Sequence, residues 1–140
     1  MLKKSFRVMA LPPYVNFAIA VLRIGVGVLM IPHGYSKLSR VLDSNYAFGD
    51  PIGIGEVPSL FLTIFAELFC SVLVLVGLFT RPALAVLIFT MGVAVFLVNL
   101  SKGLSGMEKG LLFLIPYISL FILGPGKYSL DYYIFGKKRR

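Results

Sequence analysis

Apolar residues are arranged along this chain in four long runs, which are separated by short segments rich in charged residues, glycine and proline. The runs cover approximately residues 14–37, 60–79, 83–100 and 107–123. A helix needs about 20 predominantly apolar residues, within a usual range of about 17–25, to cross a bilayer. The pattern therefore predicts an all-α integral membrane protein whose four spans form a single domain over residues 1–140.

The fourth run is the shortest, because only thirteen residues, Leu111 to Leu123, lie between its charged and glycine-rich borders. It reaches the length of a span only if it begins near Met107, which places Glu108 and Lys109 among the lipid headgroups. The second and third runs are joined by the short segment Gly77 to Pro82. Glycine is common where a helix ends and proline where one begins, so an antiparallel hairpin is expected there. Four consecutive spans then form an antiparallel four-helix bundle.

The composition supports a membrane location. Hydrophobic residues make up 58% of the chain and charged residues 14%, and the mean hydropathy is +0.89. A soluble domain averages roughly 45–50% apolar and about 25% charged residues. These values exclude a soluble globular enzyme, a disordered tail and a disulfide-rich secreted domain. A single cysteine also excludes an intrachain disulfide and a multi-thiolate metal site.

The net charge of +8 comes largely from basic clusters at the two chain ends. Such clusters beside apolar runs are more typical of membrane orientation than of nucleic-acid binding, so no nucleic-acid partner is expected. With both termini in the cytoplasm, the inner side carries nine basic residues and the outer side four. The inner ones are Lys3, Lys4, Arg7, Arg81, Lys127, Lys137, Lys138, Arg139 and Arg140, and the outer ones are Lys37, Arg40, Lys102 and Lys109. This bias predicts that both termini are cytoplasmic.

Two ionisable residues, Arg23 and Glu67, lie inside the first and second apolar runs. A charge at the centre of a membrane helix costs about 2.5–3.5 kcal/mol on insertion scales, so such residues usually face the bundle interior and pair. Helical spacing places Arg23 and Lys37 on one stripe, with His33 beside it. These three side chains form a cationic ladder that we expect to contact Glu67. The arrangement predicts either an anion-binding or proton-linked pocket between the first two helices, or a structural ion pair that locks them together.

Small residues favour close contact between the same two helices. Gly27 and Gly34 lie on the stripe of the first helix and would let a neighbour approach closely. The second helix carries a polar face that is made of Thr63, Glu67, Cys70 and Ser71. One histidine cannot supply both axial ligands of a bis-histidine haem, so neither haem nor a metal is expected from this chain alone.

The segment after the fourth run and the outer loop 39–58 contain polar residues for which we predict structural roles. After the fourth run, Ser129 is expected to cap a short helical turn that reaches Phe135. Asp131 is the only acidic residue on the predicted cytoplasmic side, and Arg81 in the hairpin is its expected partner in a structural ion pair. The outer loop, 39–58, is longer than most helix connections, which fits either a lid over the bundle or a mobile linker.

Several short motifs occur in a definite order along the four runs. They are Leu22-Arg23-Ile24-Gly25, His33-Gly34-Tyr35-Ser36-Lys37-Leu38, Ala66-Glu67, Gly77-Leu78-Phe79-Thr80-Arg81, Glu108, and Gly124-Pro125-Gly126-Lys127-Tyr128-Ser129-Leu130-Asp131. In their order, spacing and four-span setting they resemble the DoxX family of small bacterial membrane proteins, over almost the whole chain. The resemblance implies a four-helix protein of the bacterial cytoplasmic (inner) membrane.

Relatives in that family are described as subunits of membrane oxidoreductases, including the DoxD-like subunit of thiosulfate:quinone oxidoreductase. By this resemblance, a site for a quinone headgroup or a small sulfur oxyanion is lined by Arg23, His33, Lys37 and Glu67. The chain has no flavin or dinucleotide fingerprint, so a redox role requires a bound quinone or a partner subunit.

The leading hypothesis is therefore a membrane subunit of an oxidoreductase system. Its expected partners are the lipid bilayer, further copies of the chain and other membrane or redox subunits, and the sequence assigns no catalytic residue. Two alternatives stay open: a small-solute or proton-coupled transporter that uses Glu67, and a non-catalytic scaffold of a membrane complex.

Overall fold

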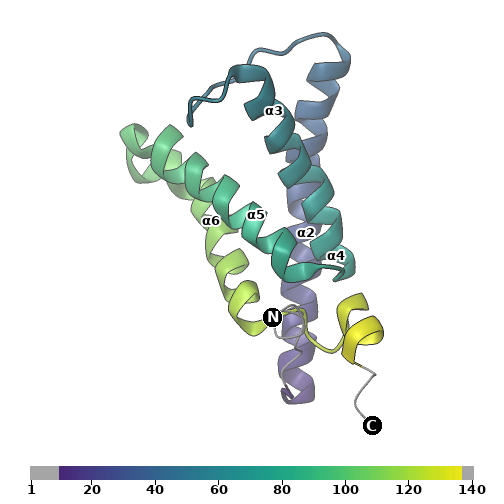
Figure 1. The fold of residues 1–140 in the computed structure, drawn as a ribbon. Coiled ribbons are helices and arrows are strands. Elements are labelled where there is room, and N and C mark those ends of the chain that lie inside the picture. Colours follow the sequence, from purple (N-terminus) through teal and green to yellow (C-terminus); the bar gives the residue numbers. More distant parts are fainter. Residues whose placement is uncertain (1–9, 137–140) are drawn as a thin grey trace.

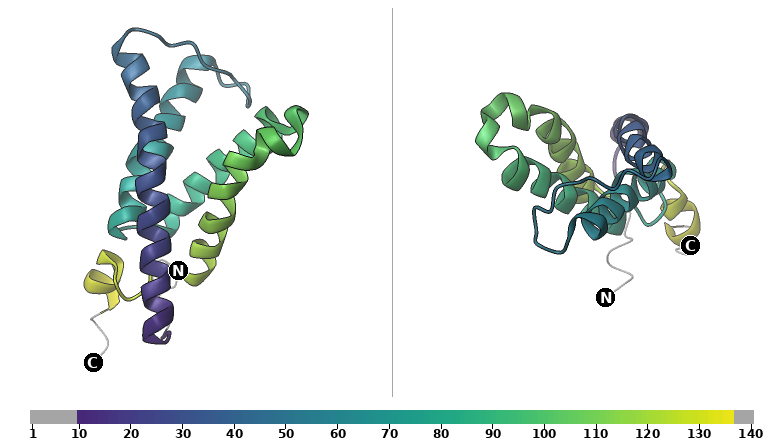
Figure 2. Two further views of the ribbon diagram at one scale, coloured as in Figure 1. Left: turned by 180° about the vertical axis from the view of Figure 1, so that it is seen from behind. Right: turned by 90° about the horizontal axis from the view of Figure 1, so that it is seen from above.

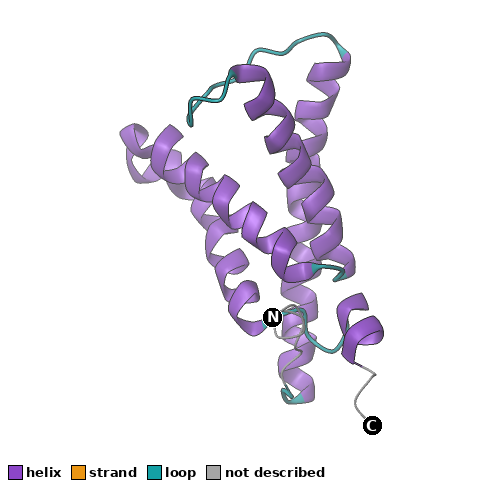
Figure 3. Ribbon diagram, viewed as in Figure 1, coloured by secondary structure: helices purple, strands orange, loops and turns teal. Residues whose placement is uncertain are grey.

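A computed structural model describes residues 10–136, and all regular secondary structure in this range is helical (Figure 3). Four helices are long and apolar enough to cross a membrane: Pro13–Leu42, Glu56–Val76, Thr80–Val98 and Leu100–Leu123. The predicted all-α architecture with four spans is thereby confirmed. The basic residues at the chain ends, on which the predicted orientation depends, lie outside the described residues.

Three of the four spans are composed of more than one helical segment. The first span is the single helix α2 (Pro13–Leu42), and the second joins α3 (Glu56–Ile64), the π-helical η1 (Phe65–Cys70) and α4 (Ser71–Val76). The third joins α5 (Thr80–Val93) and the π-helical η2 (Ala94–Val98), and the fourth joins the 3-10 turn η3 (Leu100–Lys102) and α6 (Gly103–Leu123). A last π-helical turn, η4 (Tyr132–Gly136), follows the bundle.

The spans pack as two antiparallel hairpins. Helix α2 lies beside η1 and α4, and α5 lies beside α6. The hairpins meet at the end where α4 turns into α5, and they spread apart toward the end that carries the loop 43–55 (Figures 1 and 2). The start of α2 and η4 both lie at the closed end (Figure 1).

The interior of the bundle is apolar and so is most of its outer surface. Fully buried side chains include Leu60, Val74, Leu84, Leu87, Val95, Tyr117 and Leu120. Large apolar side chains that point outward include Phe17, Leu29, Phe69, Phe89 and Ile122. Apolar side chains on both faces of a helix are typical of a chain whose surroundings are lipid.

The turn between α4 and α5 has the backbone that its sequence predicts. Helix α4 ends at Gly77, whose φ of 74° lies in the left-handed region, and Pro82 lies in the first turn of α5. Phe79 also has a positive φ, 46°. The hairpin predicted between the second and third spans is therefore present.

The fourth helix differs from its predicted start near Met107, because α6 begins at Gly103. Glu108 and Lys109 lie within this helix and both are exposed. Since these charged side chains point away from the bundle, they do not interrupt the helix. The helix therefore begins before the apolar run, because glutamate and lysine are compatible with a helical backbone and a count of apolar residues leaves them out.

The loop 43–55 is folded around one carboxylate. Asp50 Oδ1 accepts hydrogen bonds from the Ile54 amide at 2.9 Å and from the Ser59 hydroxyl at 3.2 Å, and Oδ2 accepts one from the Gly55 amide at 2.8 Å. The Gly55 amide contributes most to holding the pKa of Asp50 below its usual value. These bonds attach the loop to the beginning of α3.

Candidate functional site

Two glycines bring α2 into direct contact with the second span. A Cβ atom added to Gly34 would lie 2.7 Å from Leu68 N and 2.8 Å from the carbonyl carbon of Glu67. One added to Gly27 would lie 3.0 Å from Leu75 Cβ and 3.2 Å from Ser71 O. The predicted role of the two glycines in close helix contact is thereby confirmed.

This contact places Lys37 beside Glu67. Lys37 Nζ lies 2.6 Å from Glu67 Oε2, and the side chains are 22% and 7% exposed, respectively. A short bond between an ammonium and a carboxylate is charge-assisted and stronger than a neutral hydrogen bond. Of the predicted cationic ladder, Lys37 is thus the member that contacts Glu67.

Glu67 lies in η1, where the second span is wound as a π-helix. Short π-helical segments inside α-helices are rare and occur frequently at functional sites. The local sequence offers no proline or glycine that would force this winding. The third span has a similar segment, η2, which contains no ionisable residue, so the winding accompanies Glu67 but does not by itself identify a site.

Tyr117 of α6 adds a polar group that the sequence analysis did not single out. Its side chain is completely buried, and its hydroxyl, like that of Ser71, is shielded from solvent. Neither hydroxyl makes a hydrogen bond of good geometry within residues 10–136. A buried tyrosine hydroxyl usually has a hydrogen-bond partner. The signal for Tyr117 was available, since it is the one tyrosine within the fourth span.

His33 lies on the side of α2 that faces α6. Its ring contacts Phe113 edge-on, with the ring centroids 5.8 Å apart, and Phe113 in turn lies 6.1 Å from the ring of Tyr117. The His33 side chain is exposed and is not hydrogen-bonded to Glu67. The three aromatic rings therefore form a row that connects α2 to the buried hydroxyl group of Tyr117.

Arg23 lies outside this cluster. Gly34 contacts the backbone of Glu67, so Glu67 is about eleven residues, or roughly 16 Å, along the helix from Arg23. That separation exceeds the reach of an arginine side chain. Arg23 instead donates a hydrogen bond from Nη2 to the carbonyl oxygen of Tyr128. The predicted ladder is therefore divided between two places in the bundle.

The surroundings of Arg23 form an inner polar centre at the closed end of the bundle. Arg23 is 2% exposed, and its guanidinium occupies the space where a side chain at Gly77 would be: an added Cβ would lie 1.6 Å from Nη1. Asp131 lies close by, because its backbone amide donates a hydrogen bond to Gly77 O at 2.8 Å. Arg23 Nε and Nη1 are buried and make no hydrogen bond within the described part of the chain.

Asp131 binds backbone amides rather than the predicted Arg81. Its Oδ1 accepts a hydrogen bond from the Phe79 amide at 2.8 Å, and its Oδ2 accepts one from the Thr80 amide at 2.9 Å. Both amides lie at the start of α5, where a carboxylate is favoured by the unpaired N–H groups and the helix dipole. Within residues 10–136 there is no ion pair between Arg81 and Asp131. A helix cap therefore replaces the predicted structural ion pair.

The C-terminal turn follows its prediction more closely. Ser129 Oγ accepts a hydrogen bond from the Tyr132 amide at 3.2 Å and donates one to Gly126 O at 2.7 Å. The helical turn after Ser129 continues into η4, which the structure describes as far as Gly136. This confirms the predicted cap and places Asp131 in the first turn of this helical segment.

The Lys37–Glu67 pair has the chemistry of a ligand site. A lysine ammonium has three donors, and the bond to Glu67 uses one of them. The remaining donors can bind an oxygen atom of a ligand, and the exposed His33 ring can donate or accept. Among residues 10–136, no three His, Cys, Asp or Glu side chains are grouped so that they could hold a metal ion.

Comparison with known proteins identifies a family. The family model for DoxX matches residues 18–100, which is more than half of the chain. This range contains most of α2 and the whole of the second and third spans, and it ends before α6. No curated protein and no solved structure matches the chain. The chain therefore belongs to the DoxX family.

Proposed function

We propose that this DoxX-family membrane protein is a subunit of an oxidoreductase system and binds a quinone or a small sulfur oxyanion at the Lys37–Glu67 pair. The observation that carries the proposal is the position of this pair. Lys37 and Glu67 meet at 2.6 Å between two spans, where the second span is π-helical. Ionisable groups at membrane depth commonly mark functional sites because their burial is costly.

The donors of the site suit both ligand classes. The Lys37 ammonium can donate to a quinone carbonyl oxygen or to an oxyanion, and Glu67 can hold a proton beside it. His33 supplies a second polar group on the face toward α6, next to the ring of Phe113. An aromatic ring beside polar donors is well suited to a flat, partly apolar ligand such as a quinone. Electrons would come from a partner subunit of the proposed system.

Arg23 is assigned a positioning role in this proposal. Its hydrogen bond to Tyr128 O holds it at the closed end of the bundle. The proposed ligand set is therefore Lys37, Glu67 and His33, with Tyr117 as the buried polar group behind them.

The test is a binding titration with decylubiquinone and, separately, with thiosulfate on the purified full chain. The informative variant is the double substitution Lys37→Leu/Glu67→Leu, because replacing a buried ion pair by apolar residues often leaves stability unchanged or improved. Lys109→Leu is the matched control, since Lys109 is exposed on α6. We expect thermal stabilisation of the wild type and of Lys109→Leu by one of the two ligands, and its loss in the double variant.

A folded double variant that binds the ligand as tightly as the wild type would refute the site. Failure of both ligands to stabilise the wild type would refute the proposed ligand classes. In that case, counter-flow in vesicles that depends on Glu67 would favour the transporter, and stoichiometric copurification without any ligand would favour the scaffold.

A further inference from the structure

A pocket of about 470 Å³ lies at the closed end of the bundle, away from the Lys37–Glu67 pair. It is formed by the end of α4, at Val76, and by the segment 127–133 that follows α6. Because this segment begins four residues after the last residue of α6, the pocket lies where the fourth span leaves the bilayer. That is the level at which headgroups meet the protein.

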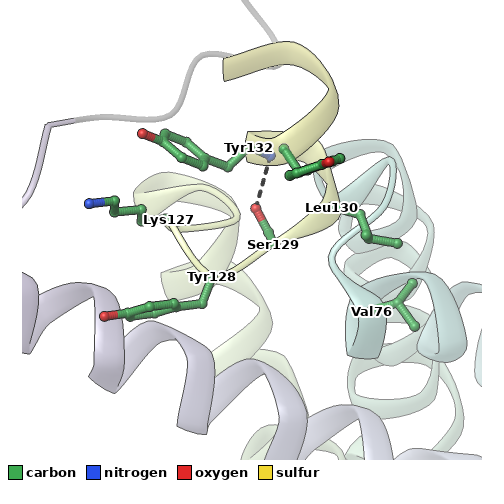
Figure 4. A pocket seen from close by; sticks show the side chains of 7 residues that line it. Val76, Lys127, Tyr128, Ser129, Leu130 and Tyr132 are labelled. Atoms are coloured by element: carbon green, nitrogen blue, oxygen red, sulfur yellow. Dashed lines mark hydrogen bonds between the residues drawn. The ribbon is translucent and has the colours of Figure 1, made fainter. Parts of the chain in front are cut away.

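The pocket has a polar side and an apolar side. The Lys127 amine and the hydroxyls of Tyr128 and Tyr132 point to one side, whereas Leu130 and Val76 lie on the other (Figure 4). A molecule that fills it must therefore combine a group that accepts hydrogen bonds with an apolar part. A phospholipid has this construction.

The charge around the pocket favours an anion. None of the described residues that line it is acidic. Asp131 is close in sequence, but it is 1% exposed and both of its oxygens accept bonds from backbone amides. Lys127 is the basic residue among those that line the pocket, and it lies shortly after the fourth span. Basic residues next to a span attract anionic lipids.

The polar side is held in place by the interior of the protein. Asn16 Oδ1 accepts a hydrogen bond from the Lys127 amide at 2.8 Å, and Arg23 donates to Tyr128 O. Both anchors are buried residues of α2. The two residues that present a cation and a hydroxyl are therefore fixed by their backbones, while their side chains remain exposed.

We propose that this pocket binds one anionic phospholipid of the leaflet at the closed end of the bundle. The phosphate binds the Lys127 ammonium and the hydroxyls of Tyr128 and Tyr132. The glycerol and the beginning of an acyl chain lie against Val76 and Leu130. The site is separate from the proposed quinone or oxyanion site and shares no residue with it.

The test uses native mass spectrometry and thermal unfolding of the full chain in detergent with added dioleoylphosphatidylglycerol or dioleoylphosphatidylcholine, which have the same acyl chains. We expect the anionic phosphatidylglycerol to be retained and to stabilise the protein more than the zwitterionic phosphatidylcholine does. Lys127→Gln should weaken the binding of phosphatidylglycerol about fivefold, because one basic group near a membrane surface is lost. Lys109→Gln, which removes an exposed lysine of α6, should leave it unchanged.

Equal retention of the two lipids, or equal binding by the wild type and Lys127→Gln, would overturn the proposal. Stabilisation by soluble glycerol 3-phosphate as strong as that by the lipid would assign the site to a free phosphate ester instead. Tyr132→Phe removes one hydroxyl and keeps the ring, so a smaller loss in this variant supports the assigned polar side. Decylubiquinone binding should be unaffected in all three variants, which separates this test from that of the proposed function.

Discussion

The two polar centres of this protein lie on the same helix and are built differently. Lys37 and Arg23 are both cations of α2, fourteen residues or about 21 Å apart along its axis. Lys37 binds a carboxylate side chain of the neighbouring span. Arg23 binds a backbone carbonyl of the segment that closes the bundle.

The Lys37–Glu67 contact can be replaced by a ligand, whereas the contact between Arg23 and Tyr128 O is part of the fixed structure of the bundle. An ion pair between two side chains can exchange one partner for a ligand, because only rotamers have to change. A cation held by a backbone carbonyl and seated over Gly77 can leave only if the chain segment moves. A basic residue is therefore suited to ligand binding at one end of α2 and to a structural role at the other.

The largest effect is expected at the inner polar centre. Asp131→Ala removes the cap of α5, whose two hydrogen bonds come from the Phe79 and Thr80 amides. It should lower the free energy of unfolding by about 2–4 kcal/mol, because two hydrogen bonds to a buried, charged carboxylate are lost. Unfolding by denaturant in mixed micelles measures this. Arg81→Gln is the control, with a loss below about 1 kcal/mol, and equal losses in the two variants would restore the ion pair expected from the sequence.

The Lys37–Glu67 pair should respond differently to single and double substitution. Glu67→Gln leaves the ammonium of Lys37 without its carboxylate and should cost about 1.5–3 kcal/mol of unfolding free energy. Lys37→Leu/Glu67→Leu should return to the stability of the wild type or exceed it. Unfolding by denaturant in mixed micelles compares the stability of the single and the double variant. A double variant that is less stable than Glu67→Gln would show that this pair is as structural as the inner centre.

The close contact between α2 and the second span is tested by two glycines of the same helix. Gly34→Ala should cost about 1–3 kcal/mol because the new methyl group meets the backbone of Glu67 and Leu68. Gly25→Ala should be neutral or stabilising by up to about 1 kcal/mol, since nothing lies within 4 Å of its added Cβ atom. Thermal unfolding compares the two variants, and equal stabilities would contradict the contact.

The smallest effect concerns a second carboxylate that binds amides at a helix start. Asp50 resembles Asp131 in this respect but is exposed. Its pKa lies below the usual 3.8 in the folded state, so its stabilising effect is fully present above that value and is lost as the pH falls through the lowered pKa. Hydrogen exchange of the Ile54 and Gly55 amides should accelerate over this acidic range after correction for intrinsic rates.

Asp50→Asn is the control for this titration. It cannot ionise, so amide protection in the loop should be weaker and nearly independent of pH. An Asp50→Asn protein that keeps the full pH dependence of the wild type would assign the effect to another group.

Much of the architecture followed from local patterns. The four apolar runs, the Gly77 turn and the Ser129 cap depend on residues that are close together in the chain, and each is present in the structure. The close contact along α2 could also be predicted from the sequence, because helical periodicity alone places Gly27 and Gly34 on one face.

The sequence predicted only in part which charged side chains pair with one another. Helical spacing placed Arg23 in the cationic ladder that was expected to contact Glu67, but the register of the two spans is set by where Gly34 meets the backbone of Glu67. Asp131 was assigned to Arg81 from charge alone, whereas the geometry of the α5 start offers it two amides. Tyr117 was missed because hydropathy counts it among the residues of an apolar span, although it is the one tyrosine within the fourth span.

The sequence by itself determined the family, the all-helical class and the number of spans, because hydropathy and short-range backbone preferences act along the chain. Only the tertiary structure decided which cation meets which anion. A lysine, an arginine or a helix start can each satisfy a carboxylate equally well, and the choice among them depends on how packing sets one helix against another. In this packing Glu67 pairs with Lys37, and Asp131 binds amides at the start of α5. Arg23 binds the backbone carbonyl of Tyr128.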